Sequence, residues 1–409
     1  MAYFHAKAAL QLAGFDDGKF WEISIPQASR QEPAIHHAVL ALSSLHERFV
    51  RSDPSLFGSW GRDQDAFALT HYNKAIQRLV SRGPGSQQKP IDVCLITCML
   101  FYCIEVSISQ RNETQVDPNH LKAIRGHTGS SISHVQSGIK VLTQLSKGKS
   151  KLPRSAIPFT SLSRLEVFFN RLDAATVAMV GTKPMEISDG DSSGPPGFQS
   201  FIPSTFNSLE EASNSLDYHF NRCLRQTENA HLLTDRDLKV FVCQRPHYFD
   251  VFSSWHNSFK TFLTKNPNLT YRHMQQARTL QLLHTLCCVI VRTATDTGEI
   301  AEMNFDKNIP MYTRLISLAR QIVDTQIAME SDADKKPHFS LEMNITAPLY
   351  AVAHRCRDPH LRREAVALMR RCHRREGIWD SLQAAQVAET VIEIEVRITA
   401  FGYLVPTPI

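Results

Sequence analysis

Apolar side chains recur at intervals of three and four residues along most of the 409-residue chain. This spacing is typical of helices with one buried face, whereas the strict alternation that indicates strands is scarce. We therefore predict an all-α fold, a multi-helix array of packed helical hairpins that forms one continuous domain. No fixed period of repetition emerges, which argues against a regular solenoid.

The first strong helical pattern begins at Pro33, a residue that suits the first turn of a helix. A second helix should follow and stop at Gly83-Pro84-Gly85, so that the two form a hairpin. Residues 91–106 are apolar on all sides, which predicts a helix surrounded by others. The apolar faces expected for the first two helices are Ile35, Val39, Leu42, Leu45 and Phe49, and Ala68, Tyr72, Ala75 and Leu79.

A change in composition divides the helical pattern into two halves. Between Gly181 and Pro203 the chain is rich in Gly, Pro, Ser and Asp, which cannot sustain a helix. We predict an N-terminal helical half at 1–180, a Gly/Pro/Ser-rich loop at 181–207 and a C-terminal helical half of the same domain at 208–409. Further helices are expected at 132–142, 162–180, 250–263, 273–293 and 310–328, and Ser208, followed by Glu210 and Glu211, should start another.

Composition narrows the class of protein. Hydrophobic residues make up 43% of the chain and charged residues 21%, which is ordinary globular usage. The longest charge-free stretches, 93–104 and 279–291, are shorter than the roughly 18 apolar residues that a membrane span needs. The N-terminus carries His5 and Lys7 within its apolar stretch, so we expect neither a membrane segment nor a secretion signal.

The nine cysteines favour a reducing compartment and give no support to a metal site. Cys94, Cys98 and Cys103 lie in an apolar helical run, where free cysteine packs as a small hydrophobe. No Cys-x-x-Cys pair occurs in the sequence, and structural zinc sites commonly need two. His36 and His37 are adjacent, so on a helix they point about 100° apart and do not share one ion.

One string has a catalytic appearance, because Gly190-Asp191-Ser192-Ser193-Gly194 fits the Gly-x-Ser-x-Gly pattern of serine hydrolases. A nucleophile of that class needs a buried strand before it and a helix after it, whereas this string lies in the polar loop. The sequence contains neither the Gly-x-x-x-x-Gly-Lys-Ser/Thr phosphate loop nor a strand-linked Gly-x-Gly-x-x-Gly motif, so nucleotide binding through either has no support. We therefore predict no catalytic, cofactor-binding or metal-binding residues, no cofactor and no enzymatic activity.

The strongest local feature is the segment 354–377, which holds eight arginines against three acidic residues, a balance of +5 that equals the net charge of the whole chain. Asp358 should cap a helix that begins at Pro359 and ends near Gly377, with an apolar stripe opposite the arginines. We predict a solvated basic face, partly neutralised by the last helix, which carries Glu389, Glu393 and Glu395. Contact with nucleic acid is the alternative, although interleaved aromatic residues are absent.

Several strings spread along the chain are helix-packing and capping strings and contain no catalytic motif. The strings are Phe20-Trp21, 32–42, His71–Ile76, Cys94–Glu105, His134–Ile139, Pro348–Tyr350 and 356–381. Together they resemble the regulatory (middle to C-terminal) region of fungal zinc binuclear-cluster transcription factors, a group that includes regulators of secondary-metabolite gene clusters.

The resemblance implies a protein of the nucleus, with the cytoplasm as the alternative location, that regulates transcription and binds protein partners, either other regulators or a second copy of itself. A small-molecule effector is also consistent with it. Members of that family usually begin with a six-cysteine, two-zinc DNA-binding module, which has no counterpart in this sequence. We therefore expect a regulator-like protein without its own DNA-binding head, for which direct DNA binding is not expected.

Two other classes of function stay open at this point. The chain is alternatively a stand-alone helical scaffold or accessory protein that takes no part in transcription. A hydrolase that uses Ser192 is the third hypothesis, and loss of activity on Ser192→Ala substitution would be its signature.

Overall fold

The computed structural model describes most of the chain, and its residues group into two compact units. Unit 1 consists of the described residues of 1–176 and 336–342, and unit 2 of those of 177–183, 200–335 and 343–409. Nearly all regular structure in both units is helical, which confirms the predicted all-α class. The described residues are 1–15, 18–51, 59–81, 88–108, 129–150, 152–180, 201–227, 235–293, 305–329 and 337–400.

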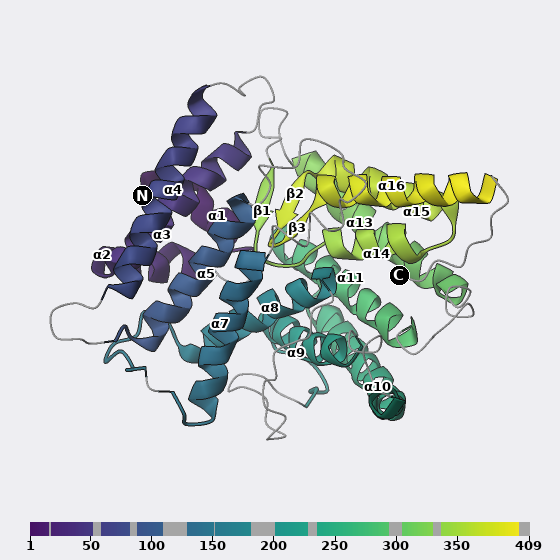
Figure 1. Cartoon of the computed structure of the whole chain (residues 1–409). Coiled ribbons are helices and arrows are strands. Elements are labelled where there is room, and N and C mark those ends of the chain that lie inside the picture. Colours follow the sequence, from purple (N-terminus) through teal and green to yellow (C-terminus); the bar gives the residue numbers. More distant parts are fainter. Residues whose placement is uncertain are drawn as a thin grey trace. The chain divides into compact units, whose positions relative to one another are not determined.

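Unit 1 is built around a helical hairpin, as the apolar spacing predicted. Helix α3 (Pro33–Val50) begins at its proline and packs along α4 (Ser59–Val80) (Figure 1). The expected faces of both helices are buried, except that Phe49 and Leu79 are half-buried. The smaller elements of unit 1 are the π-helical turns Phe4–Ala8 and Phe20–Ser24, α1 (Ala9–Leu12), α2 (Ile25–Gln31) and strand β1 (His338–Ser340).

Helix α5 (Ile91–Ile108) is the core helix of unit 1. It packs against α3 and α7 (Gly129–Ser146), and 78% of it is buried. By length and composition alone it is the one described helix apolar enough to cross a membrane, a property that a buried core helix shares. Glu105, an acidic residue near the C-terminal end of α5, accepts a hydrogen bond of 2.7 Å from the Tyr72 hydroxyl of α4.

Helix α7 packs closely against α8 (Leu162–Val180) at Gly138. A Cβ built on Gly138 would lie 2.0 Å from Cε1 of Phe169, which is far inside van der Waals contact. Phe169 is itself 1% exposed, so it has little room to move. Only glycine therefore allows the two helices to approach this closely at this point.

Unit 2 contains the remaining helices. Helix α9 (Leu209–Thr227) starts as predicted, because the Ser208 hydroxyl accepts a 3.0 Å hydrogen bond from the Glu211 amide, and Glu211 accepts one from the Asn207 amide. Helix α9 packs on α10 and α11, and α13 packs on α11, α14 and α15. The bounds are α10 Asp235–Lys265, α11 Tyr271–Thr293, α13 Ile309–Met329, α14 Thr346–Arg355, α15 Pro359–Cys372 and α16 Ser381–Ala400.

Two helix ends differ from the predictions. Helix α10 starts 15 residues before the predicted Asp250 and continues through Pro246, which lies inside it. Helix α15 ends at Cys372, although the sequence predicted an end near Gly377. His373 has a φ of 22° and Gly377 a φ of 56°, so the backbone leaves helical geometry and forms a hairpin of β2 (Arg374–Glu376) and β3 (Trp379–Asp380).

Some predictions fall on residues that the structure does not describe. The helix stop at Gly83-Pro84-Gly85 and positions 181–200 of the predicted loop lie outside the described residues. Residues 201–207, which complete that loop, form no helix. The prediction that the two halves belong to one continuous domain stays a prediction.

The close approach at Gly138 gives a prediction about stability. Gly138→Ala should lower the free energy of unfolding by about 1–3 kcal/mol, because the added methyl group forces Phe169 out of a packed position. Gly129→Ala is the matched control in the same helix, since nothing lies within 4 Å of its added Cβ. Urea unfolding measures both, and equal stability of the two variants would contradict the packing described at Gly138.

Candidate functional site

The Gly-x-Ser-x-Gly string around Ser192 lies outside the described residues. Cys103 of α5 is fully buried, and Cys94 and Cys98 are half-buried beside it. Burial raises the pKa of Cys98 to about 12, so this thiol stays protonated and is a poor nucleophile or metal ligand. These positions agree with a packing role for the three cysteines.

His37 meets a partner that is distant in the sequence. Its Nδ1 lies 3.0 Å from Nδ1 of His71 on α4, so one ring donates a hydrogen bond to the other. His36 and His37 have ring centroids 5.6 Å apart. Burial lowers the pKa of both His37 and His71, and neighbouring positive groups lower both further. Within the described ranges, no three His, Cys, Asp or Glu side chains converge as a metal site would require.

The arginine-rich segment is only in part the solvated face that the sequence predicted, because five of its eight arginines are exposed and three are not. Arg362, Arg374 and Arg375 are buried, with exposed fractions of 9%, 4% and 4%. A buried guanidinium needs a partner, because its desolvation is otherwise costly. Arg362 pairs with Glu395 of α16 and donates to the Ala353 carbonyl at 2.8 Å.

The exposed arginines of the segment are also largely paired. Arg370 donates from Nε to Glu389 of α16 at 2.8 Å, which confirms that α15 and α16 form a hairpin with a neutralising acidic helix. The remaining carboxylates come from elements that the local sequence did not indicate. Arg371 pairs with Asp324 at 2.7 Å and Arg357 with Asp306 at 3.4 Å. The concentrated +5 balance is therefore mostly neutralised in the folded protein.

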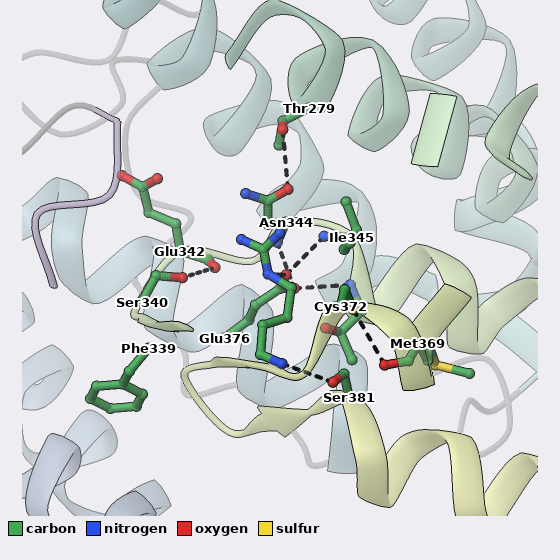
Figure 2. A network of polar contacts seen from close by, with 12 residues as sticks. Thr279, Phe339, Ser340, Glu342, Asn344, Ile345, Met369, Cys372, Glu376 and Ser381 are labelled. Atoms are coloured by element: carbon green, nitrogen blue, oxygen red, sulfur yellow. Dashed lines mark hydrogen bonds and ion pairs between the residues drawn. The ribbon is translucent and has the colours of Figure 1, made fainter. Parts of the chain in front are cut away.

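The most buried charge in this region is the carboxylate of Glu376, which is 0% exposed (Figure 2). It accepts hydrogen bonds from three successive backbone amides at the start of α14, and the Nε of Arg374 lies 2.8 Å from Oε1. The carboxylate thus satisfies donors that a helix start leaves unpaired, and its charge suits the positive end of the helix dipole. The amide partners are Asn344 at 2.9 Å, Ile345 at 3.0 Å and Thr346 at 3.0 Å.

Neighbouring side chains extend this network to two more helices of unit 2 (Figure 2). The Asn344 side chain accepts a 3.1 Å hydrogen bond from the Thr279 hydroxyl of α11. The Ser381 hydroxyl, at the start of α16, accepts one of 2.9 Å from the Arg374 amide. Asp380 caps α16 by accepting from the Leu382 and Gln383 amides, and pairs with Arg375 at 3.5 Å. We call Glu376, Arg374, Asn344, Thr279 and Ser381 the Glu376 network.

The Glu376 network has the chemistry of a structural device. Its carboxylate is saturated by three amides and a guanidinium. Sequence reasoning identified the arginines and the Asp358 cap, which accepts from the His360 and Leu361 amides at 2.9 Å, but missed Glu376. The sequence did carry a signal for it. Glu376 directly follows Arg374 and Arg375 and precedes Gly377, and buried arginines need a nearby acidic partner.

The network gives a second prediction about stability. Glu376→Gln should lower the free energy of unfolding by about 3 kcal/mol or more, because Arg374 loses its buried counterion and an amide group faces the α14 donors. Glu389→Gln, which breaks the exposed pair with Arg370, should cost less than about 1 kcal/mol. Denaturant titration of both variants measures the difference. A loss no larger in Glu376→Gln than in Glu389→Gln would contradict the proposed importance of the buried carboxylate.

Several residues of the strings that carried the family resemblance lie at packing and capping positions. Phe20 and Trp21 are fully buried, and the Phe20 ring centroid lies 4.6 Å from that of Phe168. The string 374–381 contains both strands of the hairpin, the Glu376 carboxylate and the Asp380 cap. These residues help to hold the helices in place.

Comparison with known proteins gives one distant relative. The aspercryptin biosynthesis cluster-specific transcription regulator atnN of Emericella nidulans is 22% identical over an alignment of 433 positions, which covers 87% of this chain and 66% of the relative. The chain thus spans slightly less than two thirds of that protein's length. No family model matches the chain, and no solved structure matches it. Over most of its length the chain is a distant homologue of a fungal cluster-specific transcription regulator.

Proposed function

We propose that this chain is the regulatory region of a fungal transcription regulator and controls gene expression through protein partners in the nucleus. The observation that carries the proposal is the similarity to a cluster-specific transcription regulator, which extends over 87% of the chain. Because that similarity is spread along both units, it concerns the helical scaffold as a whole. The relative is a transcription regulator and not an enzyme, in accord with the expectation of a non-enzymatic role.

The described helices are consistent with a binding role. Helical assemblies bind partners by laying one helix in a groove between others, or by pairing with a second copy. The buried Glu376 network gives unit 2 a defined arrangement of helix ends, and a defined surface lowers the entropic cost of binding. We further propose that the regulated genes belong to a secondary-metabolite cluster, as the relative's name indicates for that protein.

A reporter assay in a filamentous fungus tests the proposal. The full chain is fused to a foreign DNA-binding domain whose sites precede a reporter gene, and the DNA-binding domain alone is the control. We expect the fusion to enter the nucleus and to change reporter expression in either direction, because a regulatory region acts wherever it is tethered.

A second arm of the assay separates a specific effect from a general one. Glu389→Gln, for which we expect little loss of stability, should keep the effect, whereas Glu376→Gln, for which we expect a large loss, should lose it. A soluble, folded fusion that remains in the cytosol and leaves the reporter unchanged would contradict the proposal and favour the stand-alone scaffold. Fluorescence microscopy and immunoblotting establish location and abundance in each case.

A further inference from the structure

Unit 1 holds a cavity of about 420 Å³ that is lined entirely by polar side chains. Lys74, Gln77, Arg78 and Ser81 come from one face of α4, since residues three and four apart on a helix are neighbours. His37 lines the cavity, which is open to solvent, from α3, the other helix of the hairpin. This volume lies within the range of small-molecule sites, which is roughly 300–1,000 Å³.

The cavity carries two fixed positive charges. Residues 66–81 contain no Asp or Glu, and within the described part of the chain no carboxylate pairs with Lys74 or Arg78. Both cations lie close enough to His37 to lower the pKa of its ring, after burial as the larger cause. This sets them apart from the arginines of α15, most of which have carboxylate partners. Two convergent cations without counterions favour an anionic ligand.

The contact between His37 and His71 fixes the orientation of the His37 side chain in the cavity. The 3.0 Å contact between Nδ1 of His37 and Nδ1 of His71 orients the His37 ring, and the His71 ring packs on Phe67 at a centroid distance of 4.4 Å. Two imidazole nitrogens at this separation also suit a metal ion. However, Lys74 and Arg78 would repel a cation, and the described residues supply no third ligand.

From this geometry we infer that the cavity binds a small molecule through a phosphate monoester group. A phosphate monoester carries a charge of about −1.5 to −2 at neutral pH, which matches the two cations. Lys74, Arg78 and His37 supply donors for its oxygens, and Gln77 and Ser81 offer donors and acceptors for hydroxyl groups on the rest of the molecule. The volume exceeds what an inorganic phosphate ion fills, which favours the ester over the free ion. This inference stands or fails independently of the transcriptional role.

Isothermal titration calorimetry with the full chain tests the inference, with glucose 6-phosphate as the probe. We expect saturable binding of glucose 6-phosphate, weaker binding of inorganic phosphate and of acetate, and no binding of glucose. Lys74→Gln combined with Arg78→Gln should weaken binding at least about tenfold, because two charge-assisted contacts are lost. Both side chains are exposed, so the double variant should fold normally, which circular dichroism verifies.

Arg30→Gln is the matched control, because Arg30 is a cation of the same unit that lines a different cavity, together with Met1, His5 and His36. Its affinity for glucose 6-phosphate should stay within about twofold of the unmodified chain. Equal affinity of the double variant and the unmodified chain, or no binding at millimolar concentrations, would overturn the inference. Inorganic phosphate or acetate binding as tightly as glucose 6-phosphate would overturn the assignment to a phosphate ester.

Discussion

The carboxylate of Glu376 is a fully buried charge, and the arrangement of the helices in unit 2 depends on its partners. A buried carboxylate is tolerated only when hydrogen bonds and a counterion replace the water that it has lost. The three amides at the start of α14 and the Arg374 guanidinium supply them. Ser381 connects the start of α16 to the β2–β3 hairpin through the Arg374 amide. Thr279 connects α11 to Asn344 at the start of α14, so the network joins these three helices to the hairpin.

The residues that hold the helix ends and helix contacts are buried or capping residues. Glu376, the Asp380 cap and the buried Phe20-Trp21 pair are positions of this kind. Lys74 and Arg78, which line the cavity beside His37, are exposed instead.

The sequence predicted what depends on neighbours along the chain. The Pro33 start, the Ser208 and Asp358 caps and the buried face of α3 follow from local spacing and capping rules, and the structure confirms them. It could not predict pairs that tertiary packing creates. Arg371 and Arg357 pair with Asp324 and Asp306, which lie 47 and 51 residues away in other elements. The sequence draws attention to His36 beside His37, whereas His37 meets His71 across the hairpin.

The most direct test of the Glu376 network is native-state hydrogen exchange at the amides of Asn344, Ile345 and Thr346. The first amides of a helix usually lack an internal partner and exchange readily when solvent reaches them. If the buried carboxylate holds them as described, they exchange only when unit 2 opens, with protection similar to that of amides within α14. Exchange at these three positions as fast as in an unprotected peptide would contradict the account.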